Sequence, residues 1–112
     1  LKIDVFHQLT AYTLIFYRDS KKFDNLISLL RRIDSHDDLM HRIQVAIGDS
    51  GLISTTQLNK LITFFSTDLD KVELAKMAYG YVNETQSYAQ IINKTFVSDQ
   101  TKIHLNQYIQ RH

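Results

Sequence analysis

Residues 54–65 read STTQLNKLITFF. Ser54 and Gln57 have the spacing of a capping box, in which the serine oxygen accepts a hydrogen bond from a backbone N–H and the glutamine side chain reaches back to the start of the helix. Apolar residues then recur at the three- and four-residue intervals of a buried helix face. These residues are Leu58, Leu61, Ile62 and Phe65. The stretch therefore predicts a short amphipathic helix that begins after Ser54.

The remainder of the chain alternates in the same way between apolar helical patterns and polar capping residues. Proline is absent from the 112 residues and glycine occurs only three times. These are the two residues that most disrupt helix interiors, so we expect an all-α fold. An N-terminal helix is predicted over residues 1–20, and a polar break over residues 19–22 separates it from the helical segments of residues 23–110.

An internal repeat is visible at an offset of 31 residues, which aligns Asp37, Asp68 and Asp99. Buried-type positions coincide at the same offset, as in Ile43, Leu74 and Leu105. The pattern predicts three helix–turn–helix units, with an aspartate at the start of each second helix, where the helix dipole favours a negative charge. We therefore expect a single domain over residues 1–112, in which three hairpin units stack on the N-terminal helix as a short α-solenoid-like array.

Composition excludes several classes of protein. The formal net charge is +1, and acidic residues are interleaved with the basic ones, which disfavours nucleic-acid binding. The absence of cysteine excludes disulfides and thiolate zinc sites. The longest apolar run, residues 14–17, is far shorter than the roughly 20 residues of a membrane-spanning helix. Because the chain starts at Leu1 rather than methionine, we expect an upstream segment, which leaves the compartment open.

The densest group of potential metal ligands is His36, Asp37, Asp38 and His41. Two histidines five residues apart share a helix face less well than two residues four apart would. The alternative is a solvated helix start, with Ser35 as the capping residue and the two acids facing the positive end of the helix dipole. We favour this alternative and predict no metal and no cofactor.

Nothing in the sequence has the pattern of an active site. Asp68 and Asp70 form a carboxylate pair, but acid–base catalysis needs a pocket that separates two pKa values. A nucleophile elbow, a phosphate-binding glycine loop and a zinc-ligand helix are all missing from the sequence. We therefore predict that the domain is not an enzyme.

Tyrosines suggest where a partner could bind, because a tyrosine offers a large apolar area with a polar tip. The alternative is that tyrosines close the ends of a thin helical core, with their hydroxyls in water. We predict an interaction surface made of two groups, one on the N-terminal helix and one around a later turn. Its residues are Tyr12, Ile15, Phe16, Tyr79, Tyr81 and Tyr88.

Several segments resemble the domain-of-unknown-function family numbered 4476. They are STTQL at 54–58, LITFF at 61–65, DKVELAKMAY at 70–79 and LNQYI at 105–109, within a likeness that runs from Phe23 to Ile109. The family occurs in secreted or envelope-associated bacterial proteins and near the start of animal proline- and serine-rich proteins. The resemblance implies a non-enzymatic helical module and supplies no catalytic residues.

Three functional hypotheses follow. The first is a protein-interaction or scaffolding module of a larger protein, with an unidentified protein partner. The alternative is a domain that binds a small apolar ligand in a cavity between the N-terminal helix and the hairpins. The third is self-association through the final helix.

Overall fold

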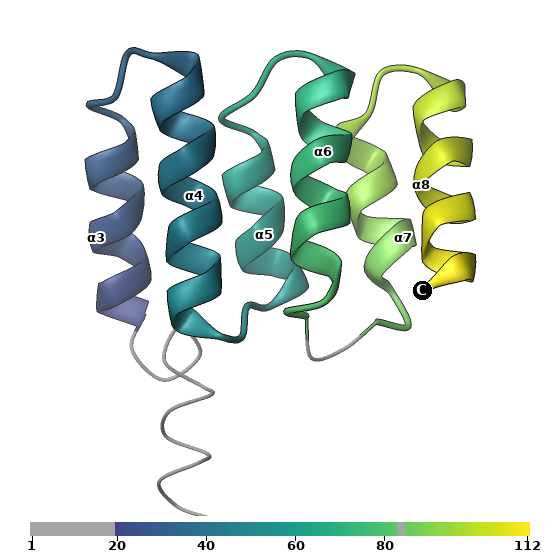
Figure 1. The fold of residues 1–112 in the computed structure, drawn as a ribbon, viewed down its shortest axis with the longest axis horizontal. Helices are drawn as coiled ribbons and strands as arrows, with labels where there is room; N and C mark the ends of the chain where they lie inside the picture. The colour runs from purple at the N-terminus through teal and green to yellow at the C-terminus, as the bar shows by residue number, and fades with distance from the viewer. Residues whose placement is uncertain (1–19, 83–84) are drawn as a thin grey trace, which may run out of the picture. The chain divides into compact units, whose positions relative to one another are not determined.

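The computed structural model describes residues 20–82 and 85–112 of the chain. The chain divides into two compact units, which meet in sequence between Ile53 and Ser54. The described residues of the first unit contain helices α3 (Ser20–Leu30) and α4 (His36–Ser50). The second unit contains α5 (Thr55–Ile62), α6 (Asp68–Tyr79), α7 (Tyr88–Ile92), the 3-10 helix η1 (Asn93–Thr95) and α8 (Asp99–Arg111) (Figure 1). No strand occurs in the described ranges, which confirms the all-α fold.

In the first unit, α4 has well-defined ends. Ser35 precedes the helix, and its Oγ accepts a hydrogen bond from the backbone N–H of Asp38 at 3.4 Å. Gly51 follows the helix in the left-handed conformation, with φ of 76°, and its N–H donates to the carbonyl of Ile47 at 3.0 Å. Buried apolar residues recur every four positions along α4, as expected for one face of a helix. It consists of Leu39, Ile43 and Ile47.

Helix α3 begins earlier than the sequence predicts. Ser20, Lys21 and Lys22 are helical, although residues 19–22 were expected to separate two helices. Lysine is a favourable helix former, so a polar run that contains it need not end a helix. Phe23 and Leu30 are seven residues apart and both buried. Residues 1–19 of the N-terminal helix predicted for residues 1–20 lie outside the described residues, which start at Ser20.

The second unit confirms the capping box. The backbone N–H of Ser54 donates to Oε1 of Gln57 at 3.1 Å, and the backbone N–H of Gln57 donates to Oγ of Ser54 at 3.0 Å. The two bonds satisfy donors that a helix start otherwise leaves without partners. The apolar residues predicted for this helix are all buried. They are Leu58, Leu61, Ile62 and Phe65.

Helix contacts in the second unit place its core between α5, α6, α7 and α8. Helix α6 packs on α8 and α5, and α7 packs on α5 and α8. The most deeply buried side chains come from all four helices. They include Leu58, Leu74, Ala75, Ala78, Tyr88, Ile92 and Leu105.

Helix α7 is shorter than its apolar pattern predicts. The pattern runs through Ile92 to Phe96, but the α-helix ends at Ile92 and gives way to η1. The Oγ1 of Thr95 donates to the carbonyl of Ile92 at 2.7 Å, and such a local bond competes with the helical pattern. Phe96 is buried in an extended conformation instead.

Asp68 ties α6 to the start of α8. Its carboxylate accepts hydrogen bonds from the backbone N–H of Val97 at 2.9 Å, from that of Ser98 at 2.8 Å, and from the hydroxyl of Thr101 at 3.0 Å. These donors, the Val97 N–H first, lower the pKa of Asp68 against the opposing effect of burial. Asp68 and Asp99 are the first residues of α6 and α8, and Asp37 lies in the first turn of α4. The aspartates therefore occupy the predicted helix starts, while the three-unit repeat as a whole stays a prediction.

Candidate functional site

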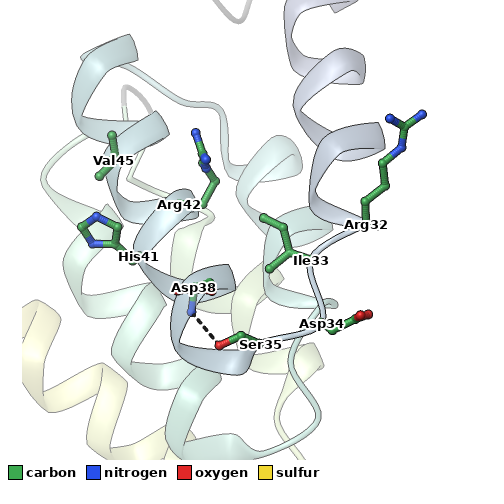
Figure 2. Close-up of a pocket in the computed structure, with 8 residues that line it drawn as sticks. All are labelled: Arg32, Ile33, Asp34, Ser35, Asp38, His41, Arg42 and Val45. Carbon is green, nitrogen blue, oxygen red and sulfur yellow. Dashed lines mark hydrogen bonds between the residues drawn. The ribbon is translucent and has the colours of Figure 1, made fainter.

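The first unit carries an open groove along the start of α4, with a volume of about 660 Å³. Figure 2 shows its residues, which come from the connection between α3 and α4 and from α4 itself. In the figure, Ile33 points toward α4, whereas the guanidinium of Arg32 points away from it. The groove, called the α3–α4 groove below, is lined by Arg32, Ile33, Asp34, Ser35, Asp38, His41, Arg42 and Val45.

Helical spacing places four of these residues together. His41 and Arg42 each lie three or four residues from both Asp38 and Val45, and these are the intervals that share a helix face. The hydrogen bond from the Asp38 N–H to Ser35 fixes the angle at which the connection enters α4. One face of α4 and the preceding connection are therefore held against each other by local structure.

The chemistry of the groove is an apolar strip between charged groups. Ile33 is half-buried, and Val45 is 43% exposed. Arg32 and Arg42 are exposed. Within residues 20–82 and 85–112, neither guanidinium has an ion pair or hydrogen bond. Both can thus bind groups that are not part of the described chain.

The histidines and acids at this helix start do not form a metal centre. His36, Asp37, Asp38 and His41 are all exposed. Across the part of the chain that the structure describes, no cluster of three or more histidine or acidic side chains is arranged to hold a metal ion. Ser35 caps the helix and the two aspartates lie in its first turn, where the helix dipole favours them.

The tyrosines of the second unit differ in their surroundings. Tyr79 and Tyr81 are half-buried and reach the surface. The predicted place of Tyr88 on an interaction surface is wrong. Its side chain has no exposed area, and its hydroxyl donates a hydrogen bond to the carbonyl of Ala75. The alternative, in which tyrosines close the ends of the core with their hydroxyls in water, does not describe Tyr88 either, because its hydroxyl is buried. Tyr12, Ile15 and Phe16 lie outside the described residues.

An aromatic and basic cluster, which the sequence does not reveal, surrounds Tyr108 on α8. The ring of Tyr108 lies 6.5 Å from that of Tyr79 and stacks on His112 at 4.2 Å, measured between ring centroids. The ammonium of Lys76 lies 5.4 Å from the Tyr108 centroid, within the range of a cation–π interaction. Lys76 also reaches Nε2 of His104 at 3.3 Å. In the sequence, the four-residue spacing of His104, Tyr108 and His112 was the signal that could have placed these residues on one helix face.

A family model described as a domain of unknown function, DUF4476, matches residues 18–109. The chain belongs to the DUF4476 family. The resemblance drawn from the sequence is thereby confirmed. No curated protein and no solved structure matches the chain at a significant level.

The DUF4476 match includes the whole α3–α4 groove, together with Tyr79, Tyr81 and Tyr108. Tyr12, Ile15 and Phe16 precede it. In the described residues of this DUF4476 domain, no helix has the length and apolar character needed to cross a membrane.

Proposed function

We propose that this DUF4476 domain is a non-enzymatic protein-interaction module, and that the α3–α4 groove receives part of a protein partner. The observation that carries the proposal is a pair of arginines, Arg32 and Arg42, which are exposed, have no ion pair or hydrogen bond to the described residues, and line the groove with Ile33 and Val45. Interfaces between proteins combine an apolar centre with a polar rim, and arginine is enriched in them. Arginine and aromatic residues also supply much of the binding energy.

The charge of the groove supports a protein partner over a nucleic acid. Arg32 and Arg42 are accompanied by Asp34 and Asp38, so the formal charges cancel when His41 is neutral. Capture of a phosphate backbone needs a clear excess of positive charge. A polypeptide can instead offer both acidic and basic side chains to the groove.

The exposure of the acids supports the non-enzymatic part of the proposal. Asp34 and Asp38 both face solvent. A catalytic carboxyl group is usually tuned by burial or by a close charged neighbour. The apolar-ligand alternative gains no support from this groove, whose lining is mostly polar or charged. The cavity that it requires would involve residues 1–20, which precede the described side chains.

The test is affinity capture from a lysate of the source, with the whole chain as bait. The bait variant is Val45→Asp, which places a charge in the apolar strip of the groove. The matched control is Ile103→Asp, because Ile103 is an exposed apolar residue, at 50%, on a helix of the other unit. Circular dichroism first establishes that both variants fold.

A partner held by the wild type and by Ile103→Asp, but lost by Val45→Asp, is the expected result. Retention of the same partner by Val45→Asp would place the contact elsewhere, with the Tyr108 cluster as the next surface to test. If the wild type retains nothing, the proposal is wrong. Self-association is tested separately, by the dependence of molar mass on protein concentration in light scattering.

A further inference from the structure

The second unit contains a small pocket with a distinctly basic lining. Its volume is about 330 Å³, at the lower end of the range for sites that bind small molecules. None of the described residues that line it is acidic. They are Asn59 and Thr63 at the end of α5, Phe65, Lys71 on α6, and Lys94 and Thr95 of η1. We call it the Lys71–Lys94 pocket.

Lys71 supplies a cation with a fixed position. Its Nζ donates to the backbone carbonyl of Thr95 at 2.7 Å, and its side chain is half-buried. One ammonium proton is thereby used, and two remain for other acceptors. The nearby Asp68 interacts electrostatically with Lys71, but it is not among the lining residues, and its oxygens accept hydrogen bonds from the start of α8.

Lys94 supplies a second cation, whose ammonium has no acceptor among the described residues. Its side chain is exposed. Nothing in residues 20–82 and 85–112 forms an ion pair or hydrogen bond with its ammonium. The two lysines lie on different elements and line one pocket, so a ligand inside it meets two positive charges.

The remaining lining groups restrict the chemistry of a ligand further. The hydroxyl of Thr63 donates to the carbonyl of Lys60 at 2.6 Å, and that of Thr95 donates to the carbonyl of Ile92 at 2.7 Å. Both hydroxyl protons are therefore used within the protein. The donors that remain are the two ammonium groups and the amide of Asn59. Phe65 also lines the pocket, with 4% of its surface exposed.

We propose that the Lys71–Lys94 pocket binds a small organic oxyanion, whose charged oxygens lie between the two ammonium groups and whose apolar part lies against Phe65. Lysine binds phosphate and carboxylate groups as a point charge. The pocket is larger than an inorganic ion needs, which is why an organic group accompanies the oxyanion. This site belongs to the second unit and goes beyond the function proposed for the α3–α4 groove.

The test is to add small-molecule probes to the isotopically labelled whole chain at low ionic strength and to monitor the NMR chemical shifts of its backbone amides. The probes are phenyl phosphate, benzoate, inorganic phosphate and phenol. We expect saturable shifts around Lys71 and Lys94 with phenyl phosphate or benzoate, weaker binding of inorganic phosphate, and none of phenol. The tighter of the first two probes identifies the oxyanion as phosphate or carboxylate.

Two variants assign the binding to the pocket. Lys94→Gln removes a cation that has no bonded partner in the described structure, so the fold is expected to persist, and binding should weaken about three- to fivefold, as for an exposed ion pair. Lys21→Gln makes the same charge change on α3 in the first unit and should leave the affinity unchanged. The proposal is overturned if no probe gives saturable shifts, if phenol binds as well as phenyl phosphate, or if the two variants weaken binding equally.

Discussion

Oδ2 of Asp68 accepts a hydrogen bond from the backbone N–H of Ser98, 30 residues later in the chain, at 2.8 Å. Ser98 is the residue that caps α8, so the first residue of α6 fixes the position at which α8 begins. The hydroxyl of Thr101, in the first turn of α8, donates to the same oxygen at 3.0 Å. One carboxylate thus joins two helices that also share a core.

Replacement of Asp68 should weaken this connection. We expect Asp68→Asn to lower the free energy of unfolding by about 1 kcal/mol, the usual effect of losing a good cap or a charge-assisted hydrogen bond. Asp99→Asn is the matched control, because Asp99 begins α8 but is exposed and, among the described residues, pairs only with Lys102 at 3.5 Å. Its effect should stay below about 0.5 kcal/mol. Urea unfolding measures both values, and equal losses would contradict this role of Asp68.

The same carboxylate makes stability depend on acid pH. Its pKa is lowered in the folded state, first by the Val97 N–H, from an ordinary value of 3.8. A lowered pKa contributes stability above the unfolded value, and this stability is lost as pH falls through the folded value. The difference in unfolding free energy between wild type and Asp68→Asn should therefore be constant above about pH 4 and should decrease as the pH falls below that value. Urea unfolding at a series of pH values measures it. A gap that persists into strong acid would contradict the assignment.

Tyr88 is held in the core by its hydroxyl as well as by its ring. Tyr88→Phe keeps the ring but leaves the carbonyl of Ala75 without this donor. We expect a loss of about 1–2 kcal/mol in unfolding free energy, as for other buried hydrogen bonds. Tyr81→Phe is the control, because Tyr81 is half-buried and its hydroxyl bonds to no described residue. Thermal and urea unfolding should separate the two variants clearly, and similar stabilities would show that the bond contributes little.

Replacement of Gly48 and of Gly51, at the end of α4, by alanine should change the stability of the protein in opposite directions. Gly48 is helical, and a Cβ there meets no atom within 4 Å, so Gly48→Ala should stabilise the protein by about 0.5–1 kcal/mol. Gly51 has φ of 76°, a conformation that costs other residues about 1 kcal/mol or more. Gly51→Ala should therefore destabilise. Melting temperatures of the two variants should fall on either side of the wild-type value.

Much of the fold follows from local signals in the sequence. The capping box at Ser54 and the apolar spacing after it identify α5, and the absence of proline indicates helices throughout. Tyr88 could not be assigned in this way, because tyrosine suits both a surface and a core. Its position depends on Ala75, a hydrogen-bond partner on another helix. Sequence spacing shows neither the contact nor the burial.

The candidate sites were less predictable than the helices. Arg32 and Arg42 are ten residues apart in the sequence, and they line one groove because the chain reverses direction between α3 and α4. Lys71 and Lys94 come from different elements of the second unit. They share a pocket because of how those elements pack together. The periodicity of residues within one segment does not predict that packing.

The burial of Tyr88 also limits the alkaline range of the fold. Burial raises the pKa of its phenol well above the ordinary value of 10.0. An unfolded chain can release this proton near pH 10, whereas the folded chain keeps it, so the stability that this group contributes is lost as the solution becomes more alkaline. Phenolate absorbance in a base titration should therefore rise in two stages. In the second stage the Tyr88 phenol ionises together with the loss of helical circular dichroism, and that stage should be absent from Tyr88→Phe.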